Sequence, residues 1–281
     1  MTYETILFER RGHTAMVTLN RPERLNAYNE QMHADLRNAW VEVNQDDDIW
    51  TVVVTGTGRA FCTGADMREA SAHMSKGQLG APRWEYNVDF LRMYNELSQL
   101  RDRGLGLPRP DTGYPGKPLI SAINGICCGD GMWFLYMSDF CICADDTTIF
   151  DPHVTVAISP PGIIHLPRQV PRAMGFAVMM LGLDYRMPAQ RAYELGMVTE
   201  VVPREQLLER ALGLAEDINS WSAPLATRAA KAAFWTTFSD EYEASRPWGR
   251  IFEDHVRFQT EDAKEGRKAY QEGRQPQWGA R

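Results

Sequence analysis

The chain has 281 residues, of which 44% are hydrophobic and 24% are charged, and its formal net charge at pH 7 is −7. These values are typical of a globular protein with a sizeable core, and the acidic balance argues against electrostatic binding of nucleic acid. The sequence has no apolar stretch of about 18 residues or more and no signal-peptide pattern, so we expect a cytoplasmic protein without a membrane partner.

The N-terminal quarter predicts a strand pair, a helix and a further strand. Residues 6–20 alternate around a glycine turn, as in a β-hairpin. A helical stripe follows, which an acidic turn at 46–48 ends. Residues 50–56 ("WTVVVTG") form a continuous apolar run, which is typical of a buried parallel strand. The stripe consists of Leu25, Met32, Leu36, Ala39, Trp40 and Val43.

The alternation of strands and helices continues to residue 203, and only helical patterns follow. We therefore expect an α/β domain over residues 1–203 and a helical region over residues 204–281. The segment 101–118 is rich in glycine and proline, so it is either a functional loop or a surface insertion. The predicted elements of the middle are strand 118–125, helix 131–140, strands 141–144 and 149–154, helices 173–183 and 189–196, and strand 198–203.

Five cysteines occur in the sequence, and none belongs to a C-x-x-C pair. Their number is odd, and Cys141 and Cys143 lie on one face of an apolar run, where a free cysteine acts as a small hydrophobic residue. We therefore expect neither a disulfide nor a metal site. The cysteines are Cys62, Cys127, Cys128, Cys141 and Cys143.

Two turns with glycines each follow a predicted strand and precede a predicted helix, at residues 56–70 and 123–134. Backbone N–H groups at such a turn suit an anion or a developing oxyanion, although neither turn matches a phosphate-binding loop. Together the two turns can supply two N–H donors to one oxygen atom. The alternative is that the glycines serve only the turn geometry.

Six motifs in order resemble the crotonase (enoyl-CoA hydratase/isomerase) superfamily: "TLNRPERLNAYNEQM", "VVVTGTGRAFCTGADMRE", "KPLISAINGICCGDG", "YMSDFCICADDTTIF", "AYELGMVTEVV" and "EDAKEG". The resemblance runs from Tyr3 to Arg274, with only the segment 101–116 out of step. It implies an α/β fold with a ββα-repeat spiral core, a helical C-terminal region that packs on a neighbour, and homotrimers or dimers of trimers. It also implies acyl-CoA thioester substrates, with coenzyme A as part of the substrate and no separate cofactor.

The resemblance places the two oxyanion donors on the backbone N–H groups of Ala65 and Asp130. Most members of the family have glycine where Asp130 stands, so its carboxylate either acts chemically or caps the helix that follows. The family's acyl pocket corresponds to residues 71–90, Trp133 and the C-terminal helices. Candidate substrate-binding residues are Gly64, Asp66, Gly129, Trp133, Arg24 and Arg68, with Arg59 as a further candidate for the CoA phosphates.

Both glutamates that enoyl-CoA hydratases use are absent, because Trp133 and His153 stand at their positions. We therefore do not expect ordinary hydration. Asp151 and His153 share one face if the segment 149–154 is extended, and a carboxylate can orient a histidine that acts as general base. The alternative is that Asp151 caps a turn and His153 is a core histidine.

Three functions remain open for the protein. The first is hydrolysis of a carbon–carbon bond in a β-dicarbonyl compound, because "DPH" resembles the "GPH" segment of relatives that cleave cyclic β-diketones with His and Asp. The second is enoyl-CoA hydration or double-bond isomerisation with His153 as the single base. The third is a non-catalytic acyl-CoA-binding protein.

Overall fold

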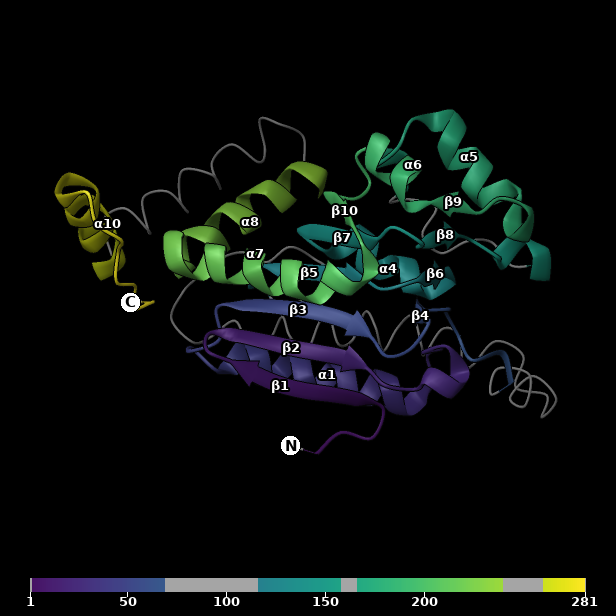
Figure 1. The fold of residues 1–281 in the computed structure, drawn as a ribbon, viewed down its shortest axis with the longest axis horizontal. Coiled ribbons are helices and arrows are strands. Elements are labelled where there is room, and N and C mark those ends of the chain that lie inside the picture. Colours follow the sequence, from purple (N-terminus) through teal and green to yellow (C-terminus); the bar gives the residue numbers. More distant parts are fainter. Residues whose placement is uncertain (1, 69–115, 158–165, 240–259, 281) are drawn as a thin grey trace.

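The computed structural model describes residues 2–68, 116–157, 166–239 and 260–280 (Figure 1). The expected pocket segment 71–90 and nearly all of the glycine- and proline-rich segment 101–118 lie outside the described residues.

The larger sheet has the strand order β1-β2-β3-β5-β7-β10. Strands β1 and β2 form the predicted antiparallel hairpin, and the other neighbours are parallel. Its strands are β1 (Ile6–Arg11), β2 (Thr14–Leu19), β3 (Thr51–Gly56), β5 (Leu119–Ile123), β7 (Phe140–Ala144) and β10 (Glu200–Val202).

A smaller sheet, β4-β6-β8-β9, follows the first, and the sequence patterns did not predict it. Each of its first three strands has three residues, too few to show a period, and the first two lie inside the glycine turns. Each of the pairs β3–β4, β5–β6 and β7–β8 thus contributes one strand to each sheet, which confirms the expected ββα repeat. The strands are β4 (Ala60–Cys62), β6 (Ile126–Cys128), β8 (Thr148–Phe150) and β9 (Met187–Pro188).

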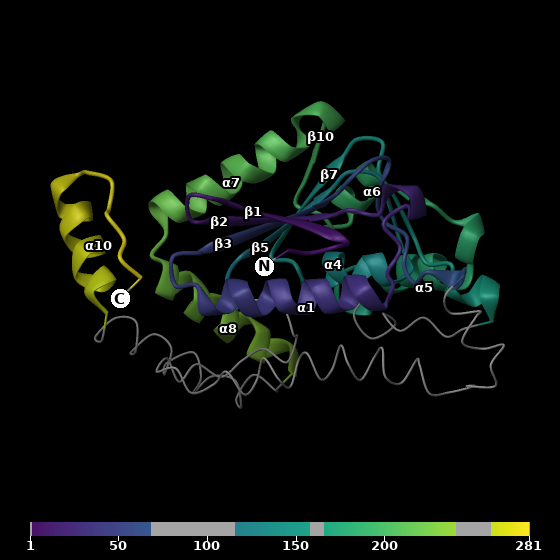
Figure 2. The same cartoon turned by 90° about the horizontal axis from the view of Figure 1, so that it is seen from below.

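Helices cover both faces of the larger sheet, as Figure 2 shows for α1 and α7. Residues Val52 and Val54 face the cluster that contains α1, whereas Val53 faces the cluster that contains α7. This alternation explains the continuous apolar run of β3, because a parallel strand between two helix layers is buried on both sides. The helices are α1 (Glu30–Gln45), α4 (Met132–Met137), α5 (Arg172–Met180), α6 (Ala189–Glu194), α7 (Leu207–Trp221), α8 (Pro224–Ser239) and α10 (Glu261–Glu272).

Helix α1 begins later than its predicted stripe. Asn29 caps it by accepting a hydrogen bond from the Met32 N–H group at 3.0 Å. Leu25, which we placed on the stripe, instead follows the short 3-10 turn η1 (Pro22–Arg24) with a φ of 53°. The remaining stripe residues are buried against the sheet as predicted. No described helix is long and apolar enough to cross a bilayer.

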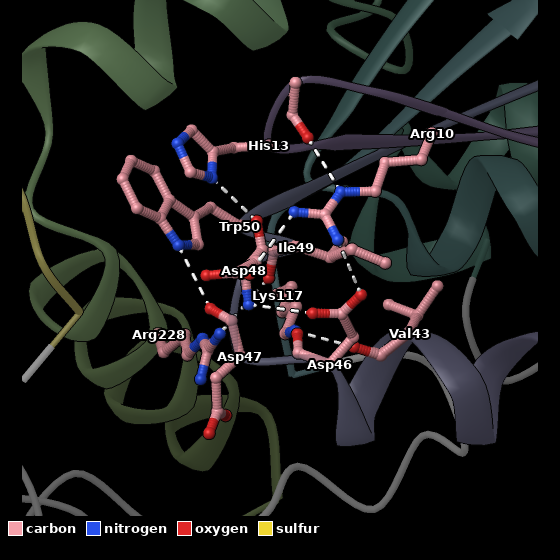
Figure 3. A network of polar contacts seen from close by, with 11 residues as sticks. Arg10, His13, Val43, Asp46, Asp47, Asp48, Ile49, Trp50, Lys117 and Arg228 are labelled. Atoms are coloured by element: carbon pink, nitrogen blue, oxygen red, sulfur yellow. Dashed lines mark hydrogen bonds and ion pairs between the residues drawn. The ribbon is translucent and has the colours of Figure 1, made fainter.

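Lys117 is a buried cation that joins the end of α1 to the start of β5 (Figure 3). Its Nζ donates to the carbonyl oxygens of Val43 at 2.6 Å and Asp46 at 2.5 Å, which α1 leaves without intrahelical partners. Lys231 Nζ donates to the Lys117 carbonyl at 3.0 Å, so helix α8 is bound to the same point. Burial, followed by the positive charge of Arg228, lowers the pKa of Lys117 to about 7.

This lowered pKa predicts a pH-dependent stability that Lys117→Met removes. The unfolded chain holds the lysine proton up to a pKa of about 10.4, whereas the folded protein releases it near pH 7. Between these values the unfolded state binds more protons, so the free energy of unfolding rises with pH by at most about 1.4 kcal/mol per pH unit. Below the folded-state pKa of about 7, Lys117 is charged in both states, so the full cost of burying its charge lowers the free energy of unfolding.

Urea unfolding of the wild type and of Lys117→Met, followed across this pH window, measures the difference in slope. The exposed Lys264 in α10 supplies the control Lys264→Met, whose slope should equal that of the wild type. Equal slopes for wild type and Lys117→Met would show that the buried amine keeps an ordinary pKa.

Candidate active site

The two glycine turns meet at Gly64 and Asp130. Gly64 has a φ of 85°, and a Cβ atom added to it would lie 3.0 Å from the backbone N of Asp130. Gly129 has a φ of 56°, and a Cβ atom there would lie 3.5 Å from the Gly64 Cα and 3.6 Å from Cε1 of His153. Both positions therefore require glycine, and the structure brings the two turns and His153 into contact.

Two backbone hydrogen bonds fix the backbone on either side of Ala65. Tyr28 N–H donates to the Gly64 carbonyl at 2.7 Å, and Asp66 N–H donates to the Tyr28 carbonyl at 2.7 Å. These bonds form a parallel bridge between Tyr28 and Ala65. No acceptor for the Ala65 N–H group is found among residues 2–68, 116–157, 166–239 and 260–280.

Asp66 belongs to the support of this turn. Its carboxylate pairs with Arg21 at 3.1 Å, and both side chains are largely buried. Oδ1 of Asp66 accepts the Arg68 N–H at 3.2 Å, and Arg21 also donates to the Ala27 carbonyl at 2.6 Å. The carboxylate thus fixes the backbone next to Ala65, although the sequence suggested Asp66 only as a substrate-binding residue.

Asn26 is a second supporting residue that the sequence analysis missed. It is fully buried with a φ of 54°, and its Nδ2 donates to the carbonyls of Thr57 and Ala60, each at 2.9 Å. Its Oδ1 accepts the Arg21 N–H at 2.8 Å. One side chain therefore joins the segment before α1 to the turn between β3 and β4. The motif "RLNA" contains this residue, but its contacts to residues 57 and 60 have no local signal.

Asp130 lies in the 3-10 turn η3 (Gly129–Gly131), at the start of α4. The N-cap of α4 is Gly131, so Asp130 does not occupy the N-cap position that the sequence suggested for it. A Cβ atom on Gly131 would overlap the Cys62 carbonyl oxygen, which keeps the two turns in close contact. The Asp130 side chain is 31% exposed and directs Oδ1 to within 3.9 Å of His153 Nε2.

Asp151 reaches His153, although not through an extended strand. Strand β8 ends at Phe150, and His153 begins the 3-10 turn η4 (His153–Val156). Oδ1 of Asp151 accepts the His153 backbone N–H at 3.0 Å and lies 2.5 Å from its Nδ1. The predicted strand 149–154 is therefore wrong beyond Phe150, because the chain turns at Pro152, where ψ is −3°.

This geometry fixes the tautomer of the histidine ring. The carboxylate of Asp151 can only accept, so Nδ1 bears a proton and the Nε2 side faces Asp130. Asp151 is 3% exposed and His153 is 8% exposed. Asp151 thus both closes the turn, through the His153 N–H group, and contacts the His153 ring.

Cys128, beside these carboxylates, is not a nucleophile. Burial raises the pKa of its thiol to about 12, and Asp151 and Asp130 add to this effect, while Arg186 opposes it. Burial and then the charge of Asp151 also raise the pKa of Tyr136. Both groups are therefore neutral at physiological pH.

The other predicted binding residues lie around the turns. Trp133 on α4 is half-buried, packs against the main core and meets Tyr136 edge-on, with ring centroids 6.0 Å apart. Arg24 is half-buried in η1, whereas Arg59 and Arg68 are exposed. A Cβ atom on Gly58 would lie 3.3 Å from Cβ of Pro22, so the turns bearing Arg24 and Arg59 adjoin.

Comparisons with known proteins agree with this architecture. The enoyl-CoA hydratase/isomerase family matches residues 9–101 and 114–281, with its gap inside the segment that was out of step. A probable enoyl-CoA hydratase of Mycobacterium tuberculosis is 32% identical over 99% of both chains. A 1,2-epoxyphenylacetyl-CoA isomerase of Escherichia coli is 30% identical over 93% of both chains.

Solved structures show the same relationship. The crystal structure of an enoyl-CoA hydratase/isomerase from Mycobacterium paratuberculosis has 37% identity and a TM-score of 0.81, covering 99% of each chain. The ββα repeat, the paired glycine turns and these matches lead to one conclusion. The chain belongs to the enoyl-CoA hydratase/isomerase family of the crotonase superfamily.

Proposed function

We propose that this protein binds an acyl-CoA thioester, or a related carbonyl compound, and stabilises its enolate between the N–H groups of Ala65 and Asp130. The Ala65 N–H group has no acceptor among the described residues, and the Asp130 N atom lies against Gly64 in the facing turn. Two such donors stabilise charge that develops on the carbonyl oxygen, because they are already oriented before reaction.

The short contact between His153 Nδ1 and Asp151 Oδ1, at 2.5 Å, is the observation on which the proposed chemistry rests. Asp151 keeps the proton on Nδ1, so Nε2 is the ring atom proposed to exchange a proton with the substrate or with water, beside the junction of the two glycine turns. The imidazolium that forms is stabilised by the same carboxylate. His153 is therefore proposed as the acid/base, and the absent glutamates are not needed.

Hydrolysis of a carbon–carbon bond is the reaction we favour. Nε2 of His153 takes a proton from water while the water oxygen bonds to the β-carbonyl carbon. The bond between this carbon and the α-carbon then breaks, and its electron pair becomes the enolate held by Ala65 and Asp130. The proton on Nε2 passes to the α-carbon, which releases a carboxylic acid and the shorter carbonyl compound.

We assign the Asp130 carboxylate the role of positioning the attacking water molecule. Its Oδ1 lies 3.9 Å from Nε2, too far for a direct hydrogen bond but suited to two groups that share one water molecule. The water would donate one hydrogen to each of the two atoms. This assignment gives the carboxylate a function that the glycine of other members does not provide.

Hydration or double-bond isomerisation with His153 as the single base is the second candidate. The names of the relatives favour it, since they include a probable enoyl-CoA hydratase and an epoxyphenylacetyl-CoA isomerase. Either reaction would pass through an enolate that the N–H groups of Ala65 and Asp130 stabilise. Acyl-CoA binding without turnover is the third candidate.

A screen of three substrate types separates these proposals. We expect cleavage of a β-keto acyl-CoA such as acetoacetyl-CoA, or of a cyclic 1,3-diketone, detected by chromatography of the acid released. Hydration of crotonyl-CoA should be weak. A crotonyl-CoA kcat/KM in the ordinary enzyme range of about 10⁴ to 10⁸ M⁻¹s⁻¹ would contradict the proposed C–C hydrolysis. Binding of acetyl-CoA without any product would favour the non-catalytic alternative.

A further inference from the structure

The segment that bears His153 has little support of its own. Turn η4 has four residues, of which only His153 is buried, while Val154, Thr155 and Val156 are exposed. The turn ends at Ala157, whose φ of 59° is unusual for a residue with a side chain. A single 3-10 turn with so few buried contacts does not hold a fixed position without help from its neighbours.

A neighbouring turn, η7 (Gly182–Asp184), supplies that help. Oγ1 of Thr155 accepts a hydrogen bond from the Leu183 N–H at 3.3 Å. Gly182 has a φ of 58°, and a Cβ atom there would overlap Thr155 Oγ1 and lie 3.2 Å from Cγ2 of Val154. The contact therefore needs glycine for two reasons, its conformation and its lack of a side chain. We refer to Thr155, Gly182 and the Leu183 N–H group as the Thr155 latch.

Thr155 of the latch and His153 belong to the same hydrogen-bonded turn. Thr155 N–H donates to the Pro152 carbonyl at 3.0 Å, so Thr155 and the three residues before it, which include His153, form one hydrogen-bonded turn. The ring itself lies between Asp151 on one side and Asp130, 3.9 Å from Nε2, on the other. A movement of the turn would change the distance from Nε2 to Asp130, because Asp130 belongs to the separate turn η3.

We propose that Thr155 is a positioning residue, which acts through the latch to hold the Nε2 atom of His153 over the junction of the two glycine turns. This inference rests on the proposed role of His153 in proton transfer. Misplacement of a reacting group by about 1 Å costs as much as 10²-fold in rate, so a small movement of η4 is sufficient to matter.

Thr155→Val tests the latch, because valine keeps the branched shape and loses the acceptor. We expect kcat for acetoacetyl-CoA to fall by about 10-fold to 100-fold with KM little changed, since the substrate-holding backbone is untouched. Gly182→Ala should have the same effect, because its methyl group displaces the Thr155 hydroxyl. Thr155→Ser retains the hydroxyl and should restore most of the activity. Val156→Thr, on the exposed side of the same turn, is the matched control.

Proton NMR gives a readout that needs no substrate. The Nδ1 proton in the short bond to Asp151 should give a far-downfield resonance, which His153→Gln removes and thereby assigns. We expect this resonance to shift or broaden in Thr155→Val and Gly182→Ala, but not in Thr155→Ser or Val156→Thr. If His153→Gln retains full turnover, the proposed function fails, while the resonance still tests the latch.

One result would overturn the proposal, namely wild-type kcat together with an unchanged resonance in both Thr155→Val and Gly182→Ala. A lower melting temperature in the same variants would then make Thr155 a purely structural residue.

Discussion

Replacing His153 by glutamine lowers kcat by about 10²- to 10⁴-fold, the usual contribution of a positioned general acid/base. Glutamine has no titrating group. It therefore cannot take the proton from water or hold it until the α-carbon is protonated. Steady-state kinetics with the β-dicarbonyl substrate that the wild type cleaves best measures the loss. KM should change little, because the thioester oxygen remains bound by the two N–H groups.

Asp151→Asn is expected to act as strongly as the loss of the histidine. An asparagine amide can donate to Nδ1, which moves the ring proton to Nε2 and leaves no acceptor for the proton of water. The exposed Asp145 provides the control Asp145→Asn, which should be as active as the wild type. Unchanged turnover in His153→Gln and Asp151→Asn would show that the pair is structural.

Gly64→Ala should lower kcat by about 10²- to 10³-fold, the cost of disabling one donor of an oxyanion hole. Its methyl group would lie 3.0 Å from the Asp130 N atom, and the residue would have to keep a φ of 85°. The facing turns must therefore separate, which moves one donor away from the oxygen atom. The measurement is kcat on the same substrate, with circular dichroism to show that the variant is folded.

Gly196 offers a matched control for backbone strain. Its φ of 76° resembles that of Gly64, but a Cβ atom there would meet no atom within 4 Å. Gly196→Ala should consequently lose some stability and retain its turnover. A folded Gly64→Ala variant with wild-type kcat would show that the junction of the two turns is not the oxyanion site.

The sequence predicted the larger sheet well, since β3, β5 and β7 are buried on both faces and appear as continuous apolar runs. The smaller sheet escaped prediction because strands such as β4, with three residues, resemble the glycine turns that contain them. The extended conformation predicted for 149–154 failed at Pro152, where the Asp151 side chain binds the next turn instead. Asp151 and His153 are neighbours, but for a different reason from the one predicted.

The candidate site was predicted in part. Glycine spacing and motif order identified both turns, and the replaced glutamate position identified His153. Arg21 and Asn26 could not be found in this way, because they support the site through contacts with residues more than 30 positions away. The contact between Thr155 and Leu183 could not be predicted for the same reason, because the partners are 28 positions apart in the sequence.

The proposed backbone donors and the proposed acid/base belong to different elements of this molecule. Ala65 and Asp130 lie in turns that follow buried strands, whereas His153 lies on the short turn η4, whose other residues are exposed. Substitutions on η4 can therefore alter the chemistry without disturbing the carbonyl-binding framework. Because the proposed donors are main-chain atoms on other turns, new reactions can arise when a few side chains on η4 are exchanged and the proposed enolate site is kept intact.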